Sequence, residues 1–487
     1  MDAALRGILA QNGPVQTEAP DRGAPTEKCD NSRLMKAVLQ VAILAAGEGK
    51  RMRSALPKVL QPLAGKPLLG HVLDTARSLQ PSAICVVYGD ETVRERYAHD
   101  DLVWTRQDPP RGTGDALRCA LAALPPNGVT LVLFGADPLA RAETLQGVAD
   151  RARDGALSLL TVDLDEPAGY GRIVRDASGK VIAIVEHKDA TPEQRAIREI
   201  NTGVIAAPTV SFRRWLDRID NRNASGEYYL SDVIALAVRD GDSIETTRAA
   251  SATEAMGVNS KRDLAELERR YQRLQAEALL DAGVTLADPA RIDVRGALRC
   301  GHDVAIDIDC IFEGTVTIGD EARVGAHCIL RNATVGAASV IAPFSLVEDA
   351  QIGARCRVGP FARIRPGTAL GDEVHIGNFV EVKSSNFGAR SKANHLAYVG
   401  DSTIGRDVNL GAGTITCNYD GASKHRTVIE DDVQIGSDTQ LVAPVTIGRG
   451  ATVGAGTTVW QDVPAGVLVV NEKTQVSRTG WKRPKKG

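Results

Sequence analysis

The stretch from Val358 to Val459 carries an apolar residue at every sixth position over long runs, and this period constrains the fold strongly. One run consists of Val358, Ile364, Leu370, Ile376 and Val382, and a second consists of Ile435, Leu441, Ile447, Val453 and Val459. A strand alternates every two residues and a helix repeats about every 3.6 residues, so a period of six fits neither. It predicts short strands of similar length, each followed by a corner.

A small residue often follows the inward apolar position, as expected where the backbone must turn tightly without a clash at Cβ. Such residues are Gly353, Gly359, Gly377, Gly436, Gly448 and Gly454. An all-β sandwich with glycine-rich turns would instead show two-residue alternation and a turn about every 8–12 residues. We therefore predict a hexapeptide parallel β-helix, a solenoid whose coils stack and pair through their backbones.

Composition limits the other possibilities. The chain has 487 residues, enough for two or three domains, and a formal net charge of −3, which argues against a broad electrostatic contact with nucleic acid. Its eight cysteines form no C-x-x-C pair, so we interpret them as reduced thiols of a cytoplasmic protein. No apolar run reaches the roughly 18 residues that a membrane span needs. We expect no nucleic-acid partner and no membrane insertion.

The sequence divides into five predicted segments. The first residues have no periodicity and several prolines and charges, which predicts a disordered leader. Met35, directly before the first apolar run, is an alternative start that the intact mass of the native protein would test. A connecting helix is predicted from apolar residues at helical spacing, namely Leu264, Leu267, Tyr271, Leu274 and Leu279. The predicted boundaries are 1–36 for the leader, 37–260 for an α/β domain, 261–282 for the linker helix, 283–476 for the β-helix and 477–487 for the tail.

The α/β assignment rests on alternating patterns in the first half. Apolar runs at Ala37–Ala46, Ala83–Tyr88 and Thr130–Phe134 are separated by helical patterns at His71–Leu79 and Asp115–Leu124. This alternation predicts a mainly parallel sheet, in which ligands bind beyond the carboxyl ends of the strands.

A glycine loop, G-E-G at residues 47–49, lies at such a strand end. Its consecutive backbone N–H groups can bind phosphate, and Arg51 and Lys58 can neutralise the phosphate charge. The loop by itself leaves a phosphate site and a plain tight turn equally open.

Several motifs of the first half resemble those of the sugar-phosphate nucleotidyltransferases. They are L-A-A-G-x-G-x-R-M at 44–52, L-P-K-V-L at 56–60, G-T-G at 112–114, G-Y-G-R-I at 169–173, V-E-H-K at 185–188, E-I-N-T-G at 199–203 and G-V-N at 257–259. With the six-residue repeat behind them, the chain is similar, over about residues 37–485, to the bifunctional N-acetylglucosamine-1-phosphate uridyltransferase/glucosamine-1-phosphate acetyltransferase family. The resemblance implies a Rossmann-like nucleotidyltransferase domain followed by a left-handed parallel β-helix.

For the first domain, the resemblance implies attack of a sugar-1-phosphate oxygen on the α-phosphorus of UTP, with Mg²⁺ as cofactor and pyrophosphate as leaving group. The protein then has to align two anions and screen their repulsion. The residues implied to bind the nucleotide and the sugar are Leu44, Ala45, Ala46, Gly47, Arg51, Lys58, Gln107, Gly112, Thr113, Gly171, Glu186, Asn201 and Asn259. Asn259 is also implied as a metal ligand.

The second implied metal ligand departs from the family pattern. The family has Gly-Asp-x-Pro-Leu after the third strand, whereas residues 135–139 read G-A-D-P-L, with Ala136 at the place of the aspartate. A slip of one residue turns a strand side chain to the opposite face, but a bulge at the strand end would return Asp137 to the metal. We predict Asp137 as the second ligand and expect weakened uridyl transfer or unusual metal binding. Nearby, Asp115 stands where the family usually has a histidine.

The second half contains the groups that acetylation of an amine by a thioester needs, which are a base, oxyanion donors and cations for the sugar phosphate. His395, in K-A-N-H-L-A-Y, matches the family's general base, and an imidazole titrates near the working pH. The residues implied to bind the sugar phosphate are Arg365, Lys383, Tyr398, Asn409 and Lys424. Those implied to line the acetyl-coenzyme A site are Ala412, Asn418, Tyr419, Ser437 and Ala455. Glu472 stands where the family has an arginine near the coenzyme phosphates.

Three functions follow from this reading. The first is a bifunctional enzyme that acetylates glucosamine-1-phosphate from acetyl-CoA and then transfers UMP from UTP to N-acetylglucosamine-1-phosphate. The second is an acetyltransferase whose front domain is a weakened sugar-nucleotide-binding module. The third is a scaffold without catalysis, against which the set of His395, Lys383 and Asn418 argues. The resemblance also implies a homotrimer with acetyl-transfer sites between subunits.

Overall fold

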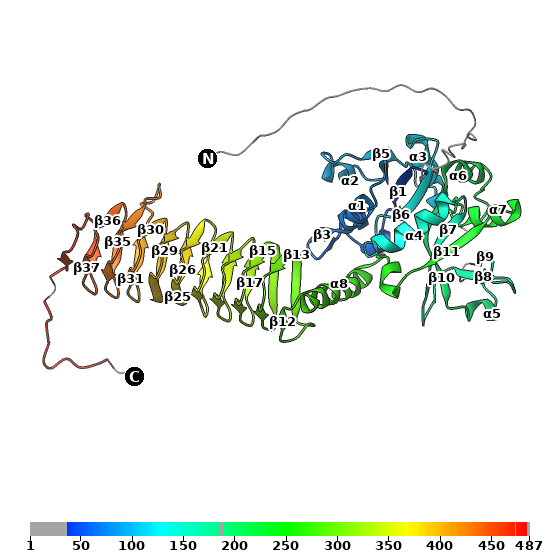
Figure 1. Cartoon of the computed structure of the whole chain (residues 1–487). Helices are drawn as coiled ribbons and strands as arrows, with labels where there is room; N and C mark the ends of the chain where they lie inside the picture. Colours follow the sequence, from blue (N-terminus) through cyan, green and yellow to red (C-terminus); the bar gives the residue numbers. More distant parts are fainter. Residues whose placement is uncertain (1–36, 186, 188, 224, 473, 485–487) are drawn as a thin grey trace, which may run out of the picture. The chain divides into compact units, whose positions relative to one another are not determined.

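The structure is a computed structural model, and it describes residues 37–484 except 186, 188, 224 and 473 (Figure 1). The predicted leader, residues 1–36, lies outside the described residues, as do the last three residues of the predicted tail. Glu186, one of the implied sugar-binding residues, is also outside them.

The first half of the described chain is an α/β domain. Its strands are β1 (Leu39–Ala45), β2 (Pro62–Leu63), β3 (Lys66–Pro67), β4 (Ala83–Tyr88), β5 (Val103–Arg106), β6 (Val129–Phe134), β7 (Leu157–Asp163), β8 (Arg172–Arg175), β9 (Val181–Val185), β10 (Glu199–Pro208) and β11 (Ile244–Arg248). Its α-helices are α1 (Leu68–Ser78), α2 (Glu91–Arg96), α3 (Thr113–Ala123), α4 (Ala142–Arg153), α5 (Pro192–Arg195), α6 (Thr209–Leu216) and α7 (Asp232–Asp240). Short 3-10 turns cover Lys50–Met52, Lys58–Leu60 and Ala252–Ala255.

The main sheet of this domain has the order β11-β7-β10-β6-β1-β4-β5. Strand β10 is antiparallel to both β6 and β7, while β1 is parallel to β4 and β6. Every residue of β1 is buried, which explains why this central strand is a continuous apolar run rather than an alternating one. The predicted mainly parallel sheet is confirmed.

Helix α8 (Lys261–Asp281) follows this domain. Ser260 and Asp263 form a capping box at its start, which satisfies backbone N–H groups of the first turn. The predicted apolar stripe is only partly right, because Leu267 is buried whereas Leu274 is 46% exposed. A buried polar residue, Gln272, holds the helix to the first coil by accepting from Val294 N at 2.7 Å and donating to Val294 O at 2.9 Å.

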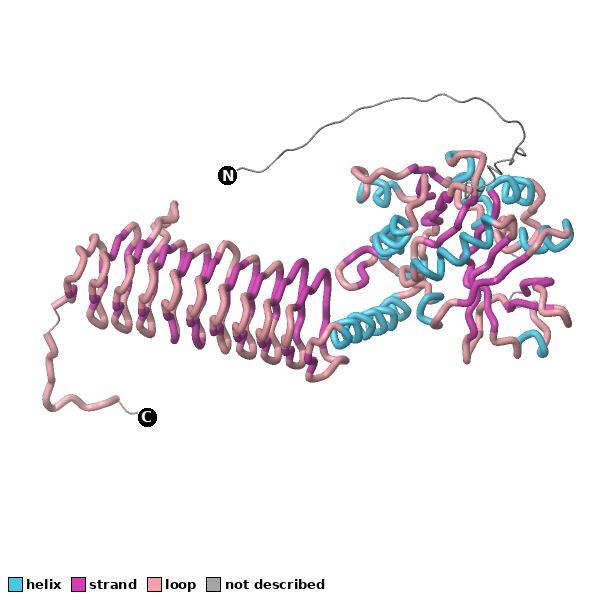
Figure 2. Tube along the Cα trace, viewed as in Figure 1, coloured by secondary structure: helices cyan, strands magenta, loops and turns pink. Residues whose placement is uncertain are grey.

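The second half is a solenoid of short parallel strands that recur at matching places on successive coils (Figure 2). The first face contains β12 (Thr285–Leu286), β14 (Ala305–Ile306), β16 (Arg323–Val324), β19 (Val340–Ile341), β22 (Arg357–Val358), β25 (His375–Asn378), β28 (Lys392–His395), β31 (Asn409–Leu410), β34 (Gln434–Ile435), β37 (Thr452–Val453) and β39 (Leu468–Val469).

The two other faces share one sheet. The second face contains β17 (Ile329–Arg331), β20 (Leu346–Glu348), β23 (Arg363–Ile364), β26 (Glu381–Lys383), β29 (Tyr398–Gly400), β32 (Ile415–Cys417), β35 (Gln440–Val442) and β38 (Thr458–Val459). The third contains β18 (Thr334–Val335), β21 (Ala350–Ile352), β24 (Thr368–Leu370), β27 (Asn386–Phe387), β30 (Ser402–Ile404), β33 (Thr427–Ile429) and β36 (Val445–Ile447). The first coils are irregular, since β13 (Ile292–Cys300) and β15 (Cys310–Ile318) are long strands that precede the division into two faces.

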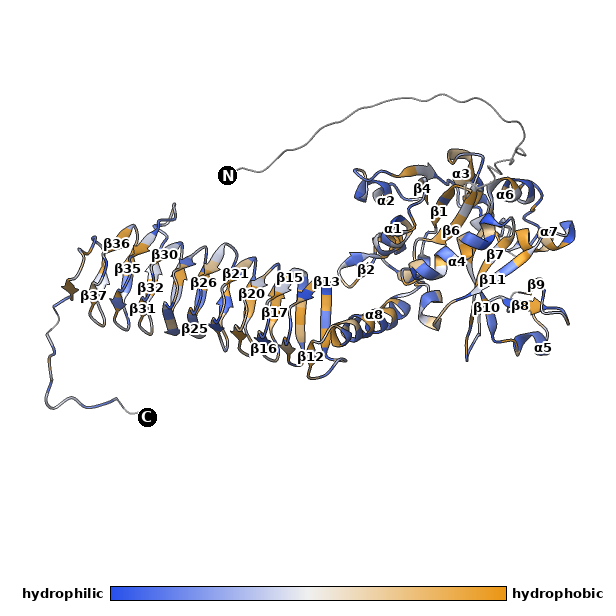
Figure 3. Ribbon diagram, viewed as in Figure 1, coloured by the Kyte–Doolittle hydropathy of each residue, from blue (hydrophilic) through white to orange (hydrophobic). Residues whose placement is uncertain are grey.

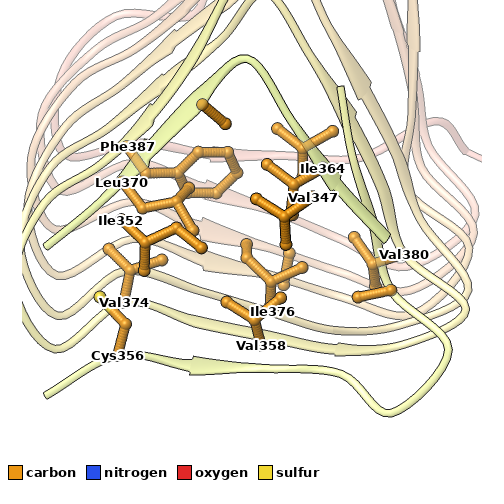
Figure 4. Packing of buried hydrophobic residues seen from close by; sticks show 14 of the residues in the cluster. Val347, Ile352, Cys356, Val358, Ile364, Leu370, Val374, Ile376, Val380 and Phe387 are labelled. Carbon is orange, nitrogen blue, oxygen red and sulfur yellow. The ribbon is translucent and has the colours of Figure 1, made fainter. Parts of the chain in front are cut away.

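The six-residue apolar register forms the core of the solenoid, as predicted. Val358, Ile376 and Val382 are completely buried, and residues of the same kind stack above one another inside the coils (Figure 4). Apolar and polar residues alternate along the same short strands, because one neighbour faces the core and the next faces solvent (Figure 3). The chain is thus a nucleotidyltransferase-like α/β domain followed by a parallel β-helix, which confirms the predicted fold class.

Glycines in the repeat mainly allow the next coil to approach closely, and fewer of them are needed for a turn of the backbone. A β-carbon at Gly436 would lie 2.5 Å from the backbone nitrogen of Ala455 on the next coil. The left-handed corner positions are instead filled by other residues, for example Asp401 with φ 50° and Phe379 with φ 56°. The predicted tight-turn explanation of the glycines is therefore right for Gly359, whose φ is 98°, but not for Gly436.

Two further observations concern the described residues as a whole. None of the helices in the described ranges is long and apolar enough to cross a membrane. Seven of the eight cysteines are described, and these seven are free thiols. Burial raises the pKa of the Cys310 thiol to about 12.

Candidate active sites

A cleft of about 640 Å³ opens at the carboxyl end of β1 and collects most of the residues implied to bind the nucleotide. The predicted residues that line it are Leu44, Ala45, Ala46, Gly47, Arg51, Lys58, Gln107, Gly112, Thr113 and Asn259. They come from the ends of β1 and β5, from two short 3-10 turns, from the start of α3 and from the residues before α8, beyond the carboxyl ends of the strands, where ligands of open α/β sheets bind.

Lys58 is held inside this cleft. Its Nζ donates a hydrogen bond to Asn259 Oδ1 at 3.2 Å, and burial lowers the pKa of its ammonium group. Gly49 makes this position possible, because its φ is 61° and a β-carbon there would lie 2.7 Å from Lys58 Cβ. The glycine loop therefore brings a cation into the cleft, in addition to any phosphate contacts of its own.

Asp115, the residue that replaces the usual histidine, orients Gln107. Gln107 Nε2 donates to Asp115 Oδ2 at 2.9 Å and to Gly112 O at 3.0 Å. Arg118 lies 4.0 Å from the other carboxylate oxygen. With its amide nitrogen fixed in this way, Gln107 turns its carbonyl oxygen to the other side, where it can accept from a nucleobase N–H.

A second cavity, of about 690 Å³, adjoins the cleft. Thr113 and Phe134 line both, so ligands in the two cavities would meet beside these residues. Asn201 lines the second cavity, and its backbone N–H donates to Gly171 O at 2.9 Å. Two of the implied sugar-binding residues are thus neighbours here.

The two implied metal ligands, Asp137 and Asn259, both lie beside Lys58. Ala136 lines the nucleotide cleft, and the Asp137 carboxylate lies beside Gly257, where a β-carbon would clash with Asp137 Oδ1, and close enough to Lys58 to interact with its charge. Burial raises the pKa of Asp137 to about 7, against the opposing effect of Lys58. The remaining ligand oxygen, Asn259 Oδ1, already accepts from an ammonium group. Among the described residues, no cluster of three or more His, Cys, Asp or Glu side chains could hold a metal. The assignment of Asp137 as a ligand stays a prediction.

In the solenoid, His395 belongs to a column of residues at one corner. Lys392, Asn409, Gln434 and Thr452 pair in register on successive coils of the first face. Three residues after each of them come His395, Ala412, Ser437 and Ala455. Backbone hydrogen bonds from Asp438 N to Ala412 O, 2.7 Å, and from Gly456 N to Ser437 O, 2.8 Å, continue the stack.

This corner column therefore places the predicted base in line with three residues implied to line the acyl-donor site. Stacked coils are about 4.8 Å apart, and the positions after His395 carry small side chains. A long, thin ligand could lie along them. Asn409 is on the adjoining first face and is partly exposed.

A second column runs along the end of the second face. Ile364 pairs with Val382 and Lys383 pairs with Gly400, so Arg365, Lys383 and Asp401 lie on three successive coils. Backbone hydrogen bonds join Arg365 N to Val382 O at 2.8 Å and Asp401 N to Lys383 O at 3.0 Å. Arg365 is paired with a carboxylate, since its Nη1 lies 2.7 Å from Glu381 Oε1.

The predicted polar residues converge over Gly400. A β-carbon there would lie 2.5 Å from Tyr398 Oη and 2.7 Å from Asn418 Nδ2, so only glycine leaves room for both. Asp401 Oδ2 accepts a hydrogen bond from Asn418 Nδ2 and lies 3.7 Å from Lys383 Nζ.

Gly400 and Asp401 were not among the residues predicted from the sequence. Asp401 comes 18 residues after Lys383 and 17 before Asn418, which is one coil in each direction. Counting in coils would have found it.

A hairpin between β32 and β33 carries the remaining implied ligands. Tyr419 and Lys424 form an antiparallel bridge across it, and Asp420 closes its turn by accepting from Ser423 N at 2.7 Å and from His425 Nε2 at 2.6 Å. Lys424 lies beside Lys383, whose ammonium lowers the pKa of Lys424. The hairpin thus brings a second lysine to the group around Asp401.

Fold and sites together define a class of protein, a nucleotidyltransferase domain joined to a hexapeptide-repeat acyltransferase. Family comparisons agree with this class. Residues 41–227 match the MobA-like NTP transferase domain, 294–389 match the GMPPB C-terminal domain, and 426–459 match the bacterial transferase hexapeptide (six repeats).

Similar proteins extend over almost the whole chain. The chain is 58% identical to the bifunctional protein GlmU of Azoarcus sp. (strain BH72) over 450 residues, covering 92% of this chain and 100% of that protein. It is 59% identical to the bifunctional protein GlmU of Burkholderia multivorans over 450 residues, 92% of this chain and 99% of that protein. The chain belongs to the GlmU family of bifunctional proteins, which confirms the family predicted from its motifs.

Proposed function

We propose that this chain makes UDP-N-acetylglucosamine in two steps. The β-helix acetylates the amine of glucosamine-1-phosphate from acetyl-CoA, and the α/β domain then transfers UMP from UTP to N-acetylglucosamine-1-phosphate with release of pyrophosphate. The observation that carries the proposal is the pair of neighbouring columns on the solenoid. One contains His395 and the small residues after it, and the other contains Lys383 with the polar group over Gly400.

In acetyl transfer, the amine nitrogen attacks the thioester carbon, the carbon–sulfur bond breaks and coenzyme A leaves as the thiolate. His395 takes the proton that the amine loses, since a neutral imidazole is a base near neutral pH. Arg365, Lys383 and Lys424 bind the sugar phosphate, with Tyr398 and Asn409 on the sugar. Asn418 donates to the oxygen that becomes negative, and Ala412, Ser437 and Ala455 leave space for the acyl carrier.

In uridyl transfer, a phosphate oxygen of the sugar phosphate attacks the α-phosphorus of UTP, and the bond to pyrophosphate breaks. Lys58 and Arg51 screen the repulsion between the two anions. Gln107, fixed by Asp115, faces the base, and Asn201 and Gly171 hold the sugar. Mg²⁺ belongs to this proposal as the ion that accompanies the phosphates of UTP, and no step here depends on a resident ion.

A second candidate function is acetyl transfer alone. It is favoured by Ala136, which presents a methyl group to the nucleotide cleft at the place where the family has a carboxylate. The front domain would then bind a sugar nucleotide without turning it over rapidly.

Assays of the two half-reactions on the purified full chain test these functions. We expect the parent protein to acetylate glucosamine-1-phosphate and to form UDP-N-acetylglucosamine from the acetylated sugar phosphate. His395→Ala should lower acetyl transfer by at least about 100-fold, because a positioned base contributes about 10²–10⁴-fold, and should leave uridyl transfer unchanged. Loss of both activities in this variant would indicate misfolding, and an unaffected acetyl transfer would contradict the role of His395.

A homotrimer with shared acetyl-transfer sites is part of the proposal. An exposed column of His327, Phe344, Phe361 and Phe379 supports it, with ring centroids 4.8, 4.9 and 5.3 Å apart. The three phenylalanines are 50%, 46% and 57% exposed. Leu396, 63% exposed and next to His395, occupies the same corner one coil further. Such an exposed apolar stripe is typical of a subunit interface, and a neighbour covering it would lie beside the base.

A cytoplasmic location is also proposed. The free thiols of the described cysteines and the use of acetyl-CoA and UTP as substrates support it.

A further inference from the structure

Asp401 occupies a position that none of the proposed roles explains. It follows β29 at a corner with φ 50°, and its side chain is only 19% exposed. A single carboxylate oxygen, Oδ2, accepts from Asn418 Nδ2 and lies 3.7 Å from Lys383 Nζ. Asp401 therefore touches one residue of the proposed phosphate site and one residue of the proposed acyl site.

The charges around it give this acid a specific effect. Lys383 and Lys424 lie side by side, so their ammonium groups repel each other, and Asp401 attracts both. Glu381 plays the corresponding part for Arg365, at 2.7 Å. In the absence of ligand, Arg365 and Lys383 are thus each paired with a carboxylate of the chain, and one positive charge of the three remains. A phosphate dianion has to draw these cations away from the carboxylates, and it also experiences the negative charges that remain.

The hydrogen bond to Asn418 gives Asp401 a second effect. An asparagine amide nitrogen carries two hydrogens, and Asp401 takes one of them. This fixes the rotation of the Asn418 amide and directs its other N–H away from Asp401. The small space over Gly400 restricts the same amide nitrogen further.

We propose that Asp401 is a positioning residue for acetyl transfer, which orients the Asn418 amide for the acyl oxygen and acts as the exchangeable counter-ion of Lys383. The inference rests on the acetyl transfer proposed above. On binding, the sugar phosphate replaces Asp401 as the partner of Lys383, while the contact of Asp401 with Asn418 persists. Asp401 thus weakens binding of the sugar phosphate and supports turnover, two effects that substitutions can separate.

Two substitutions separate the effects. Asp401→Asn removes the charge but keeps a side-chain oxygen that can accept from Asn418. Asp401→Gly removes the whole side chain. Both replacement residues tolerate a positive φ better than alanine does, so the corner is kept. Asp407→Asn is a matched control, because Asp407 is also a corner aspartate, with φ 59°, and is paired with Arg390 at 2.7 Å.

Binding of glucosamine-1-phosphate to each full-length variant is measured by calorimetry, and acetyl transfer is measured in parallel. We expect both Asp401 variants to bind the sugar phosphate about fivefold more tightly or better, since a nearby negative charge is gone. The kcat of Asp401→Asn should stay within about threefold of the parent, and that of Asp401→Gly should fall at least about tenfold, because the Asn418 donor loses the acceptor that orients it. Asp407→Asn should change neither quantity.

Unchanged or weaker binding in Asp401→Asn would overturn the counter-ion role. Equal kcat values in the Asn and Gly variants would overturn the positioning role. Failure of the proposed function is distinguishable from both results, because the parent itself would then show no acetyl transfer.

Discussion

Ala136 is the residue at which this chain departs most clearly from the motif it resembles. A methyl group faces the nucleotide cleft there, and the carboxylate one residue later lies beside Gly257 and interacts with the charge of Lys58. The chain leaves β6 in a tight turn, in which Asp137 N donates to Phe134 O at 3.2 Å, and the Asp137 carboxylate reaches Gly257.

Restoring the carboxylate at position 136 should strengthen metal binding. We expect Ala136→Asp to bind Mn²⁺, in the presence of UTP, at least about tenfold more tightly than the parent, and to raise uridyl transfer. Mn²⁺ affinity is measured by electron paramagnetic resonance, and UDP-sugar formation by chromatography. Asp165→Asn is the control, since the Asp165 side chain is 90% exposed, and it should change neither. Equal affinity and equal rates in the parent and in Ala136→Asp would mean that the slip does not matter.

Many single residues of the candidate sites could be predicted from sequence motifs. Gly47 follows a strand whose apolar run is clear, so its place at a sheet edge follows from topology, whereas Lys58 lies in a 3-10 turn and was found by its motif. Asp401 could not be found in this way, because an aspartate at a turn is ordinary and its partners are one coil away in both directions. Only the register between coils reveals it.

The strand is the element that the sequence predicts best here. A six-residue apolar register leaves few alternatives to a coil of short strands, and Val358, Ile364 and Ile376 all point into its core (Figure 4). Helix α8 was less predictable, because Gln272 replaces an apolar contact with two hydrogen bonds to Val294, while Leu274 remains exposed. The spacing of apolar residues predicts which side chains pack against the core. It does not predict a polar side chain that forms hydrogen bonds with the backbone of a strand.

Truncation within the core of the coils should destabilise the solenoid. Ile376 is completely buried on β25, and Ile376→Ala should lower the free energy of unfolding by about 2–5 kcal/mol, since it leaves a cavity that coils on both sides cannot fill. The midpoint of urea unfolding, followed by far-ultraviolet circular dichroism, measures this loss. Ile415→Ala on β32 is the matched control, because Ile415 is 42% exposed, and it should cost less than about 0.5 kcal/mol. Similar losses in both variants would contradict the inward register.

At the scale of the whole molecule, the exposed aromatic column is the feature that a single chain leaves unexplained. Stacking of Phe344, Phe361 and Phe379 stabilises the corner, but it leaves half of each ring in contact with water. Packing of another subunit against this stripe would remove that apolar surface from water.

We therefore expect a mass three times that of the 51.7-kDa chain by light scattering at micromolar concentration. Phe361→Asp should shift the mass toward that of one chain, because a charge would be buried at the interface, and should lower acetyl transfer more than uridyl transfer. Ile182→Asp is the control, since Ile182 is 44% exposed in the α/β domain, and should keep the parent's mass. A parent protein that scatters as a monomer would contradict the trimer and the shared site together.

Each coil adds one residue to every column, so the length of the solenoid changes in fixed steps. Duplicating one whole coil ahead of β19 would lengthen the solenoid by about 4.8 Å and leave the stacking of residues around His395 unchanged. Inserting a single residue would rotate every later side chain off its column. The solenoid can therefore be lengthened by whole coils while the residues of the acetyl-transfer site keep their positions relative to one another.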